Sequence, residues 1–554
     1  MFLIVPSLIS ILAGILLWFI ARRWTPASSK THKKLPPGPR GLPIIGNLHM
    51  LGNTPHRALN NLSKKYGPIM FLKLGSIPMV VISSPSAAEL ILKTHDNVFS
   101  DRPRLDAVEH ITNSSKGMAF APPYSPEWRK TKKFSIQELL NTAKIESFAD
   151  VRREEVGALL SSIKTAASGG EVVDLSEMVG ELIEKVTYKM LFGSNEKKYG
   201  LKRIVHEVTA LMGAFNIADY VPFLKPFDLQ GLYKRMKAVR NAMDNVIGEI
   251  INKHEEDARN GNKKGNMDFV DMMLFSKTLS SADKLDQENI KSLLFDLILG
   301  AIDTSYTWIE WTMAELLRSP SAMRRLQEEL EANVGLDRMV EEKDLPKLQY
   351  LEMVIKETVR LHPPTPLLLP RESMEDIEIN GYYIPKRSRV IVNAWTIGRN
   401  SSICPNINAD DFIPERFIDS DVNILGHDFV LLPFGYGKRM CPGAKLGLLN
   451  VKLIVSHLVH GFNWELPKGK SPSEMDMEEA FGLIAALEDA RNQVVEDIVE
   501  LPKFFHEIII RVVMLQSYSL LVQQGEAFYH LVSQVNPYPF SSHHQSSAAS
   551  PLLS

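Results

Sequence analysis

The sequence has very little cysteine and no excess of either charge. Only Cys404 and Cys441 occur among 554 residues, so the chain has no disulfide framework and fits a reducing compartment. Its 63 Lys and Arg against 65 Asp and Glu leave a formal net charge of −2, which argues against nucleic acid as the main partner. No internal repeat and no flavin- or nicotinamide-binding motif is evident.

A segment without charge opens the chain. Residues 2–20 contain no Asp, Glu, Lys or Arg, and this is about the length that a helix needs to cross a bilayer. Five cations follow within residues 22–34, and positive residues favour the cytosolic side. A cleaved signal peptide is the alternative, but it usually begins with basic residues and ends in a small-residue cleavage site. We therefore expect residues 1–21 to form a single-pass anchor, with the rest of the chain in the cytosol.

The segment after the anchor has a composition of its own. Residues 22–40 are basic and rich in proline, and prolines cannot join a helix or sheet interior. Beyond this hinge most of the chain has helical periodicity, with a polar break at 255–266. Turn signals at Gly75-Ser76 and Asn380-Gly381 predict paired strands, at 69–74 with 79–82 and at 377–379 with 382–384. The fold class is therefore mainly α with a minor β-sheet region.

The most informative motif is PFGYGKRMCPG at residues 433–443. It places Cys441 between two cations and the start of an apolar helix, and both features favour a thiolate by lowering its pKa. Pro442 suits a first helical turn, and Gly443 and Gly447 leave one helix face bare enough for a flat ligand. Cys404 lacks such a setting, and we interpret it as structural or incidental.

A second motif lies inside the apolar stretch 293–317. Gly300-Ala301-Ile302 is followed there by Asp303, Thr304 and Ser305. Hydroxyl side chains can bond a preceding carbonyl and bend a helix, which would open a groove for water or dioxygen. Asp-Thr-Ser is more often a helix cap or a surface patch, but its position inside an apolar helix argues against that interpretation.

Several charged residues look like ordinary surface residues when each is considered alone. Glu357 and Arg360 share one face of the helix expected at 351–361, and a lone pair of this kind is usually solvated and contributes little. The same holds for the basic cluster that follows Trp128. Their order along the chain, together with Arg371 and with Arg416 in Pro-Glu-Arg-Phe, makes them informative.

Together these motifs resemble the cytochrome P450 superfamily, most strongly its plant microsomal haem-thiolate monooxygenases (class II, A-type). The resemblance rests on F-x-x-G-x-R-x-C-x-G at 434–443, on G-A-I-D-T-S, and on E-x-x-R followed by P-E-R-F, in family order over about residues 35–483. It implies the P450 fold for a catalytic domain at 41–483, preceded by one transmembrane helix. It also implies a place in the endoplasmic reticulum membrane, with the catalytic domain facing the cytosol.

The resemblance assigns roles to residues of this chain. Cys441 would be the axial thiolate ligand of the iron of haem b, and Asp303 and Thr304 would relay protons during oxygen activation. Further haem-binding residues would be Arg439, Trp128, Lys132, Arg371, Phe434, Gly437 and Gly443. A structural network would consist of Glu357, Arg360 and Arg416. Lys132 stands where the family usually has Arg, so we expect somewhat weaker haem retention.

The resemblance also implies a reaction and its partners. We expect an NADPH-dependent monooxygenase that inserts one atom of O2 into a lipophilic small molecule, as in plant specialised metabolism. Electrons would arrive through a separate NADPH–cytochrome reductase flavoprotein, with cytochrome b5 as a second partner. Terpenoid, phenylpropanoid and alkaloid substrates stay open.

The end of the chain departs from the family pattern. The closing strands expected after Leu483 are missing, and residues 484–554 run from an acidic stretch to a Ser-rich tail. This region is either a genuine extension or the product of splicing or of an error in gene prediction. Without the terminal hairpin one wall of the pocket would be incomplete. A haem-binding but inactive protein therefore stays possible, as does a non-oxygenating haem-thiolate isomerase or dehydratase, although Asp303-Thr304 argues against the latter.

Overall fold

The computed structural model describes most of one structural unit of the chain, which ends at Gln493. The described residues are 14, 33–112, 116–170, 172–194, 199–261, 267–275, 284–400, 408–426, 428–466, 471–480 and 482–487. The predicted anchor (apart from Gly14), Cys404 and the second unit, Val494–Ser554, lie outside them. No helix among the described residues is long and apolar enough to span a bilayer.

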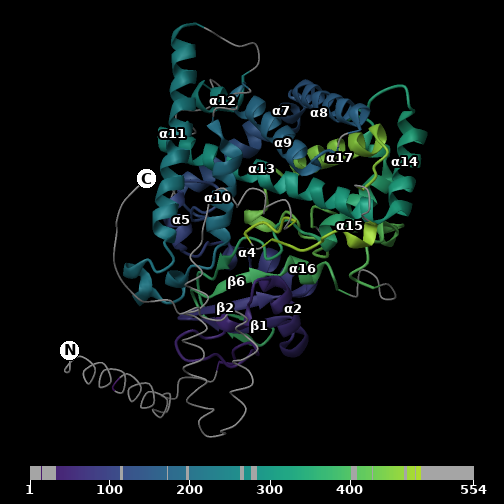
Figure 1. Cartoon of the computed structure of the whole chain (residues 1–554). Coiled ribbons are helices and arrows are strands. Elements are labelled where there is room, and N and C mark those ends of the chain that lie inside the picture. Colours follow the sequence, from purple (N-terminus) through teal and green to yellow (C-terminus); the bar gives the residue numbers. More distant parts are fainter. Residues whose placement is uncertain are drawn as a thin grey trace, which may run out of the picture. The chain divides into compact units, whose positions relative to one another are not determined.

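Helices make up most of this unit, as the sequence predicts (Figure 1). The first eight described helices are α2 (Pro55–Tyr66), α3 (Pro85–Glu89), α4 (Asp96–Phe99), α5 (Asp106–Ile111), α6 (Pro126–Phe134), α7 (Thr142–Glu146), α8 (Ala149–Gly169) and α9 (Leu175–Phe192). The remaining ones are α10 (Leu201–Gly213), α11 (Leu232–Arg259), α12 (Phe269–Phe275), α13 (Gln287–Arg318), α14 (Pro320–Val334), α15 (Gln349–Leu361), α16 (Ala394–Ile397) and α17 (Ala444–Gly461).

The strands form a small sheet and a separate hairpin. The sheet has the order β1-β2-β6-β3, with β1 (Ile69–Leu74), β2 (Ile77–Ile82), β6 (Arg389–Val392) and β3 (Arg371–Glu372). The hairpin joins β4 (Ile377–Ile379) to β5 (Tyr382–Ile384). At its turn Asn380 and Gly381 have φ of 51° and 74°, the left-handed conformations that make Asn-Gly a strong hairpin signal. Both predicted strand pairs are confirmed, and the first begins two residues earlier than predicted on its second strand.

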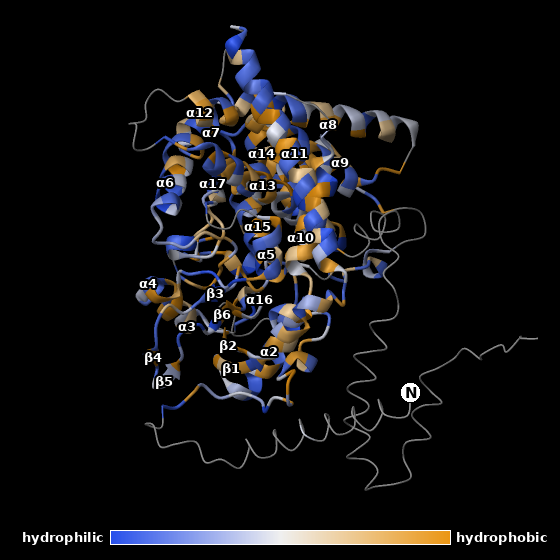
Figure 2. Ribbon diagram, turned by 90° about the vertical axis from the view of Figure 1, so that its left-hand side faces the viewer, coloured by the Kyte–Doolittle hydropathy of each residue, from blue (hydrophilic) through white to orange (hydrophobic). Residues whose placement is uncertain are grey.

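Helix α13 is the central element of the apolar core. It packs against α9, α10, α15 and α17, and Figure 1 shows it crossing the helical part of the unit beside α17. Trp311 is fully buried at 0% exposure, and a helix that is apolar all round is expected in the interior. In Figure 2, α10 and α11 carry hydrophobic and hydrophilic colours, as expected of helices with only one face in the core. The core thus holds α13 rigidly across the unit.

Two predicted boundaries are wrong by a few residues. Helix α11 continues to Arg259, so the polar break begins there and not at Glu255. Helix α17 begins at Ala444 with Gly443 as its N-cap, so Pro442 precedes the helix and does not occupy its first turn. Polar and proline-containing helix ends give weak signals, because both compositions also suit loops.

Candidate functional site

The loop that carries Cys441 owes its shape to glycine. Gly435 and Gly437 have φ of 63° and 76°, a region that residues with a Cβ rarely adopt. A Cβ on Gly437 would also lie 2.5 Å from the carbonyl oxygen of Leu92. The loop then returns, and the Cys441 N–H donates to the Phe434 carbonyl at 3.0 Å. This bond fixes the cysteine backbone just before α17.

The Cys441 side chain is accessible to solvent, yet the surrounding protein raises the pKa of its thiol. The Cys441 side chain, accessible to solvent yet surrounded by protein atoms, therefore lies in a concave part of the surface. Burial is the main cause of the raised pKa, and a backbone hydrogen bond from Gly443 opposes it.

The prediction that nearby cations lower this pKa is wrong for the free thiol. The Arg439 guanidinium turns to the backbone carbonyls of Ser100 (2.8 Å), Met118 (3.1 Å) and Ala121 (2.5 Å). A metal ion on the sulfur would deprotonate it outright.

One face of α13 borders open space next to the cysteine loop. Thr304 is half-buried, and its Oγ1 donates to the Gly300 carbonyl at 2.7 Å, the back-bonding that the sequence predicts. Gly300 is exposed, and no atom lies within 4 Å of the place where its Cβ would be. One turn beyond Thr304, the Trp308 ring packs against Phe434 with 5.7 Å between centroids. The Gly300–Thr304 face therefore adjoins the loop that holds Cys441.

Asp303 contacts another element. Its side chain is 2% exposed, its Oδ2 accepts a hydrogen bond from Thr209 Oγ1 at 2.8 Å, and its Oδ1 lies 3.3 Å from His206 Nδ1. Both partners belong to α10. Asp303 and Thr304, predicted as a pair, thus make separate contacts, and the sequence of α10 carries no motif that predicts this one.

A cluster of buried and half-buried cations contains three of the predicted haem-binding residues and one residue that was not predicted. It consists of Arg102, Lys132, Arg371 and Arg439. Burial lowers the pKa of Arg102, Lys132 and Arg439, the last to about 10, and the strongest electrostatic influence on each of these three comes from another cation of the cluster. Arg371 pairs with Asp96 at 2.7 Å. Buried cations that repel one another favour an anionic ligand.

The α6 residues reach this cluster from one side. Trp128 Nε1 donates to the Met118 carbonyl at 3.0 Å, and Lys132 and Arg439 lie 4.9 and 5.0 Å from the Trp128 ring centre. Lys132 Nζ donates to the Lys438 carbonyl. The helix therefore presents its cation beside the cysteine loop.

Sequence reasoning missed three residues of this region. Arg102 donates to the carbonyls of Leu369 and Pro370, each at 2.8 Å. The Asp96 carboxylate accepts hydrogen bonds from Arg371 Nη1 at 2.7 Å and from the backbone N–H of Lys438 at 2.9 Å. Asp296 of α13 accepts from Ala119 N at 3.0 Å, and burial raises the pKa of its carboxyl to about 6. A single arginine or aspartate carries no sequence signal that separates it from a surface charge.

The residues predicted as a structural network lie together and are almost fully buried. Glu357 accepts from Arg360 Nε at 2.7 Å and from Arg416 Nε at 2.8 Å, with side-chain exposures of 0%, 1% and 1%. Both arginines also donate to the Asp411 carbonyl, at 3.1 and 3.0 Å. The network therefore ties α15 to the segment around residues 408–416.

The last described residues pack beside α13. Ala480 N donates to the Ala486 carbonyl at 2.9 Å, so the chain turns back between them. The Ala485 carbonyl accepts from Trp311 Nε1 at 2.9 Å. A Cβ on Gly213, at the end of α10, would lie 2.1 Å from the backbone nitrogen of Leu483. The segment around Leu483 therefore closes against both α10 and α13.

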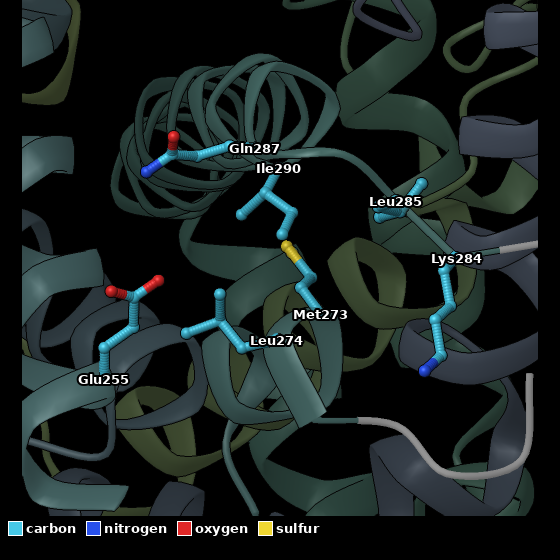
Figure 3. A pocket seen from close by; sticks show the side chains of 7 residues that line it. All are labelled: Glu255, Met273, Leu274, Lys284, Leu285, Gln287 and Ile290. Carbon is cyan, nitrogen blue, oxygen red and sulfur yellow. The ribbon is translucent and has the colours of Figure 1, made fainter. Parts of the chain in front are cut away.

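A separate pocket of about 320 Å³ lies between α11, α12 and the start of α13 (Figure 3). Figure 3 shows Met273 and Ile290 pointing toward one another in it. Ile290 is 14 residues before Thr304, which is about 21 Å along a helix. No predicted site residue lines this pocket.

Residues 36–490 match the protein family described as cytochrome P450. The chain is a cytochrome P450. It is 52% identical over 490 residues to cytochrome P450 CYP736A12 of Panax ginseng, covering 87% of this chain and 97% of that protein. It is 37% identical to the 5-epiaristolochene 1,3-dihydroxylase of Nicotiana tabacum, covering 87% and 96%. These relatives place this P450 among the plant class II members, and it is a monooxygenase.

A solved structure supports the same fold. A zebrafish cytochrome P450 solved with abiraterone superposes with a TM-score of 0.65 at 24% identity, covering 78% of this P450 and 97% of that chain. The mainly helical architecture with its small sheet is therefore the P450 fold.

The residues of the site fit the haem that the family binds through a cysteine thiolate. Cys441 offers a sulfur in a recess, and the glycines of its loop and of α17 keep side chains away from it. The four cations fit the two propionate carboxylates of haem, because these would neutralise charges that now repel one another. Within the described part of the chain, the haem iron and the haem propionates would thus both have suitable partners.

Proposed function

We propose that this P450 is an NADPH-dependent monooxygenase of plant specialised metabolism that inserts one atom of O2 into a lipophilic small molecule. The observation that carries the proposal is the position of the Gly300–Thr304 face of α13 beside the Cys441 loop. This face is open and carries one hydroxyl, and one turn further along α13 the Trp308 ring packs on Phe434 of the loop that carries Cys441. A monooxygenase needs these features to admit oxygen and to guide protons to it.

Bound haem supplies the redox chemistry. Cys441 would hold the haem as a thiolate, and its electron density would tune that chemistry. Thr304 keeps its hydroxyl hydrogen on the Gly300 carbonyl at 2.7 Å, which leaves its oxygen lone pairs to accept a hydrogen bond from water. Asp303 is the nearest acid in sequence and supplies the proton.

The substrate is proposed to be lipophilic because apolar segments converge near the site. The end of α10 meets Gly482 and Leu483, so two apolar segments that are far apart in sequence lie in contact. Named relatives act on such molecules: one is the tobacco dihydroxylase above, and another is a flavonoid 3′,5′-hydroxylase of Eustoma exaltatum, 39% identical over 490 residues. A terpenoid or phenylpropanoid substrate is therefore favoured, and an alkaloid stays open.

The proposed site of action is the endoplasmic reticulum membrane, with the anchor at residues 1–21. Exposed apolar residues lie next to the hinge and support it. Phe223 and Phe227 are 66% and 68% exposed, and Leu42 and Ile44 are 40% and 45% exposed. The two groups are joined through the β1–β2 turn, because Ser76 N donates to Tyr220 O (2.9 Å) and Gly75 N donates to Ile45 O (2.9 Å). Exposed apolar residues gathered in this way are typical of a membrane contact.

The proposed electron donor is an NADPH–cytochrome reductase flavoprotein, with cytochrome b5 as a second donor. Exposed cations on two helices near the cysteine loop support this. Arg129 and Lys133 lie on α6, and Lys445 lies at the start of α17. An acidic partner would be steered to this face by charge complementarity.

The packing of residues 482–487 favours an active enzyme over a haem-binding but inactive one. The hydrogen bonds of Ala480 and Ala485 form a turn there and hold it against α13. The experiment is to express the chain in microsomes with a plant reductase and to screen terpenoids and flavonoids for NADPH-dependent products. A hydroxylated product supports the proposal. A chain that binds haem but yields no product and no NADPH consumption supports the inactive alternative.

A further inference from the structure

We propose that His206 is the residue through which solvent protons reach Asp303. The inference rests on the proposed function, since it concerns how the acid beside Thr304 is supplied with protons. It goes beyond the predicted Asp303–Thr304 relay by adding a residue of α10 that no motif marks. Three observations carry it: the burial of Asp303, its contact with His206, and the exposure of His206.

Asp303 has no direct route to solvent. Its side chain is 2% exposed, and its Oδ1 has no hydrogen-bond partner of good geometry although it is buried. A buried carboxylate oxygen in this state is costly unless it receives a proton or a donor. His206 Nδ1, 3.3 Å away, is the nitrogen placed to provide one.

His206 reaches solvent at the same time. Its side chain is 21% exposed, and the two ring nitrogens of an imidazole can face two different partners, such as water and a carboxylate. It can therefore take up a proton from water on one side of α10 and present it to Asp303 on the other. Thr209, one turn along α10, holds the second oxygen of Asp303 at 2.8 Å.

Three charged groups on α10 and α13 face other elements or other side chains. Lys202 extends toward α9, where its Nζ would lie 2.9 Å from a Cβ on Gly180. Glu207 pairs with Arg235 of α11 at 2.8 Å. On α13, Tyr306 donates to Glu310 at 2.9 Å. Among the described residues, His206 is thus the titratable group that joins Asp303 to the surface.

The step moves one proton and no electrons. The N–H bond of protonated His206 breaks, an O–H bond forms on Asp303, and two neutral side chains replace an ion pair. Their attraction falls when the charges vanish, so the hydrogen bond from Thr209 Oγ1 becomes the main contact of the neutral carboxyl. His206 then regains a proton from water.

The test needs no known substrate. A reconstituted P450 consumes NADPH and a proton to reduce O2 to hydrogen peroxide, so peroxide formation reports proton supply. We would compare the full-length chain with His206→Gln, which cannot be protonated, and with Arg203→Gln as a matched control. Arg203 is exposed on the same helix, so its replacement removes a charge without touching Asp303.

Peroxide formation would be measured between pH 6 and 9, in H2O and in D2O. We expect His206→Gln to lower the rate at pH 7 at least about a hundredfold, the low end of what one proton-transfer group contributes, to flatten the pH profile and to enlarge the solvent isotope effect. Arg203→Gln should keep the profile of the unaltered chain. An unchanged rate, profile and isotope effect in His206→Gln would overturn the proposal.

Two further readouts separate this proposal from the proposed function. A reduced carbon monoxide difference spectrum shows whether each variant binds haem through its thiolate, and its absence in the unaltered chain defeats the proposed function. A double-mutant cycle of His206→Gln and Asp303→Asn, read by thermal unfolding, tests the contact itself. Coupling between the two replacements supports the proposal, and no coupling overturns it.

Discussion

The Thr304 hydroxyl has two roles, one as a donor within α13 and one as an acceptor in the site. Its hydrogen goes to the Gly300 carbonyl at 2.7 Å, so the oxygen can accept a hydrogen bond from water in the space beside the cysteine loop. This bond results from local helix geometry, which is why the sequence predicts it. The partners of Asp303 and Arg102 are 94 and 267 residues away in sequence, and no local pattern predicts such contacts.

Replacing Thr304 by Ala should raise the fraction of NADPH that is recovered as hydrogen peroxide instead of product, because the hydroxyl that positions water is lost. The measurement is the peroxide-to-product ratio with any substrate found in the screen. Thr312→Ala is the matched control, since Thr312 makes the same bond to the Trp308 carbonyl at 2.7 Å two turns further on. An unchanged ratio in Thr304→Ala would remove this residue from the proton relay.

Replacing Glu357 by Gln should destabilise the fold by about 3–5 kcal/mol, because it leaves two buried arginines without their carboxylate. Thermal unfolding measures this, and haem should be retained poorly. Glu352→Gln on the same helix is the control. Its side chain is 30% exposed and pairs with Lys452 and, at 3.8 Å, with Lys356, so we expect a loss of only about 1 kcal/mol. Equal losses in the two variants would contradict the structural role of Glu357.

At the scale of elements, the sequence predicts the structures that local pattern determines. Helices α13 and α15 and both strand pairs follow from periodicity and from turn residues. The packing of the chain near Leu483 against α10 and α13 does not, because it depends on backbone groups whose partners are set by tertiary structure. This packing matters most where the sequence departs from the family.

The Glu479 side chain connects the segment around Leu483 to α2. Its side chain is 4% exposed and bonds His56 at 2.7 Å and Arg57 at 3.2 Å. Burial alone would raise its pKa, but these two partners lower it to about 2 from 4.5. A carboxyl with a lowered pKa stabilises the fold above its unfolded pKa, and this contribution is lost as the pH falls from about 4.5 toward 2.

Glu479→Gln should therefore reduce the free energy of unfolding by about 2 kcal/mol at pH 7, and the difference from the unaltered chain should shrink below pH 4.5. Denaturant unfolding at several pH values measures it. Glu478→Gln, one residue earlier, is the control, because Glu478 is exposed. A difference that stays constant down to acid pH would contradict the ion-paired carboxylate.

At the scale of the whole molecule, the described unit is a plant cytochrome P450 over nearly its full family length. The match over residues 36–490 and the coverage of 97% of the ginseng relative agree with this. The haem-thiolate assignment depends on three features: the loop of Cys441, the cluster of four cations and the open face of α13. Each lies in a different part of the sequence, and only the fold brings them to one place.

The reduced carbon monoxide difference spectrum of the full chain tests this assignment most directly, because a cysteine thiolate shifts the Soret band to a position that other axial ligands do not give. Cys404→Ser, which changes the other cysteine, should leave the spectrum unchanged, and Cys441→Ala should abolish the thiolate band. We predict the thiolate band in the unaltered chain. Its absence there, or its persistence in Cys441→Ala, would contradict the assignment of Cys441 as the haem ligand.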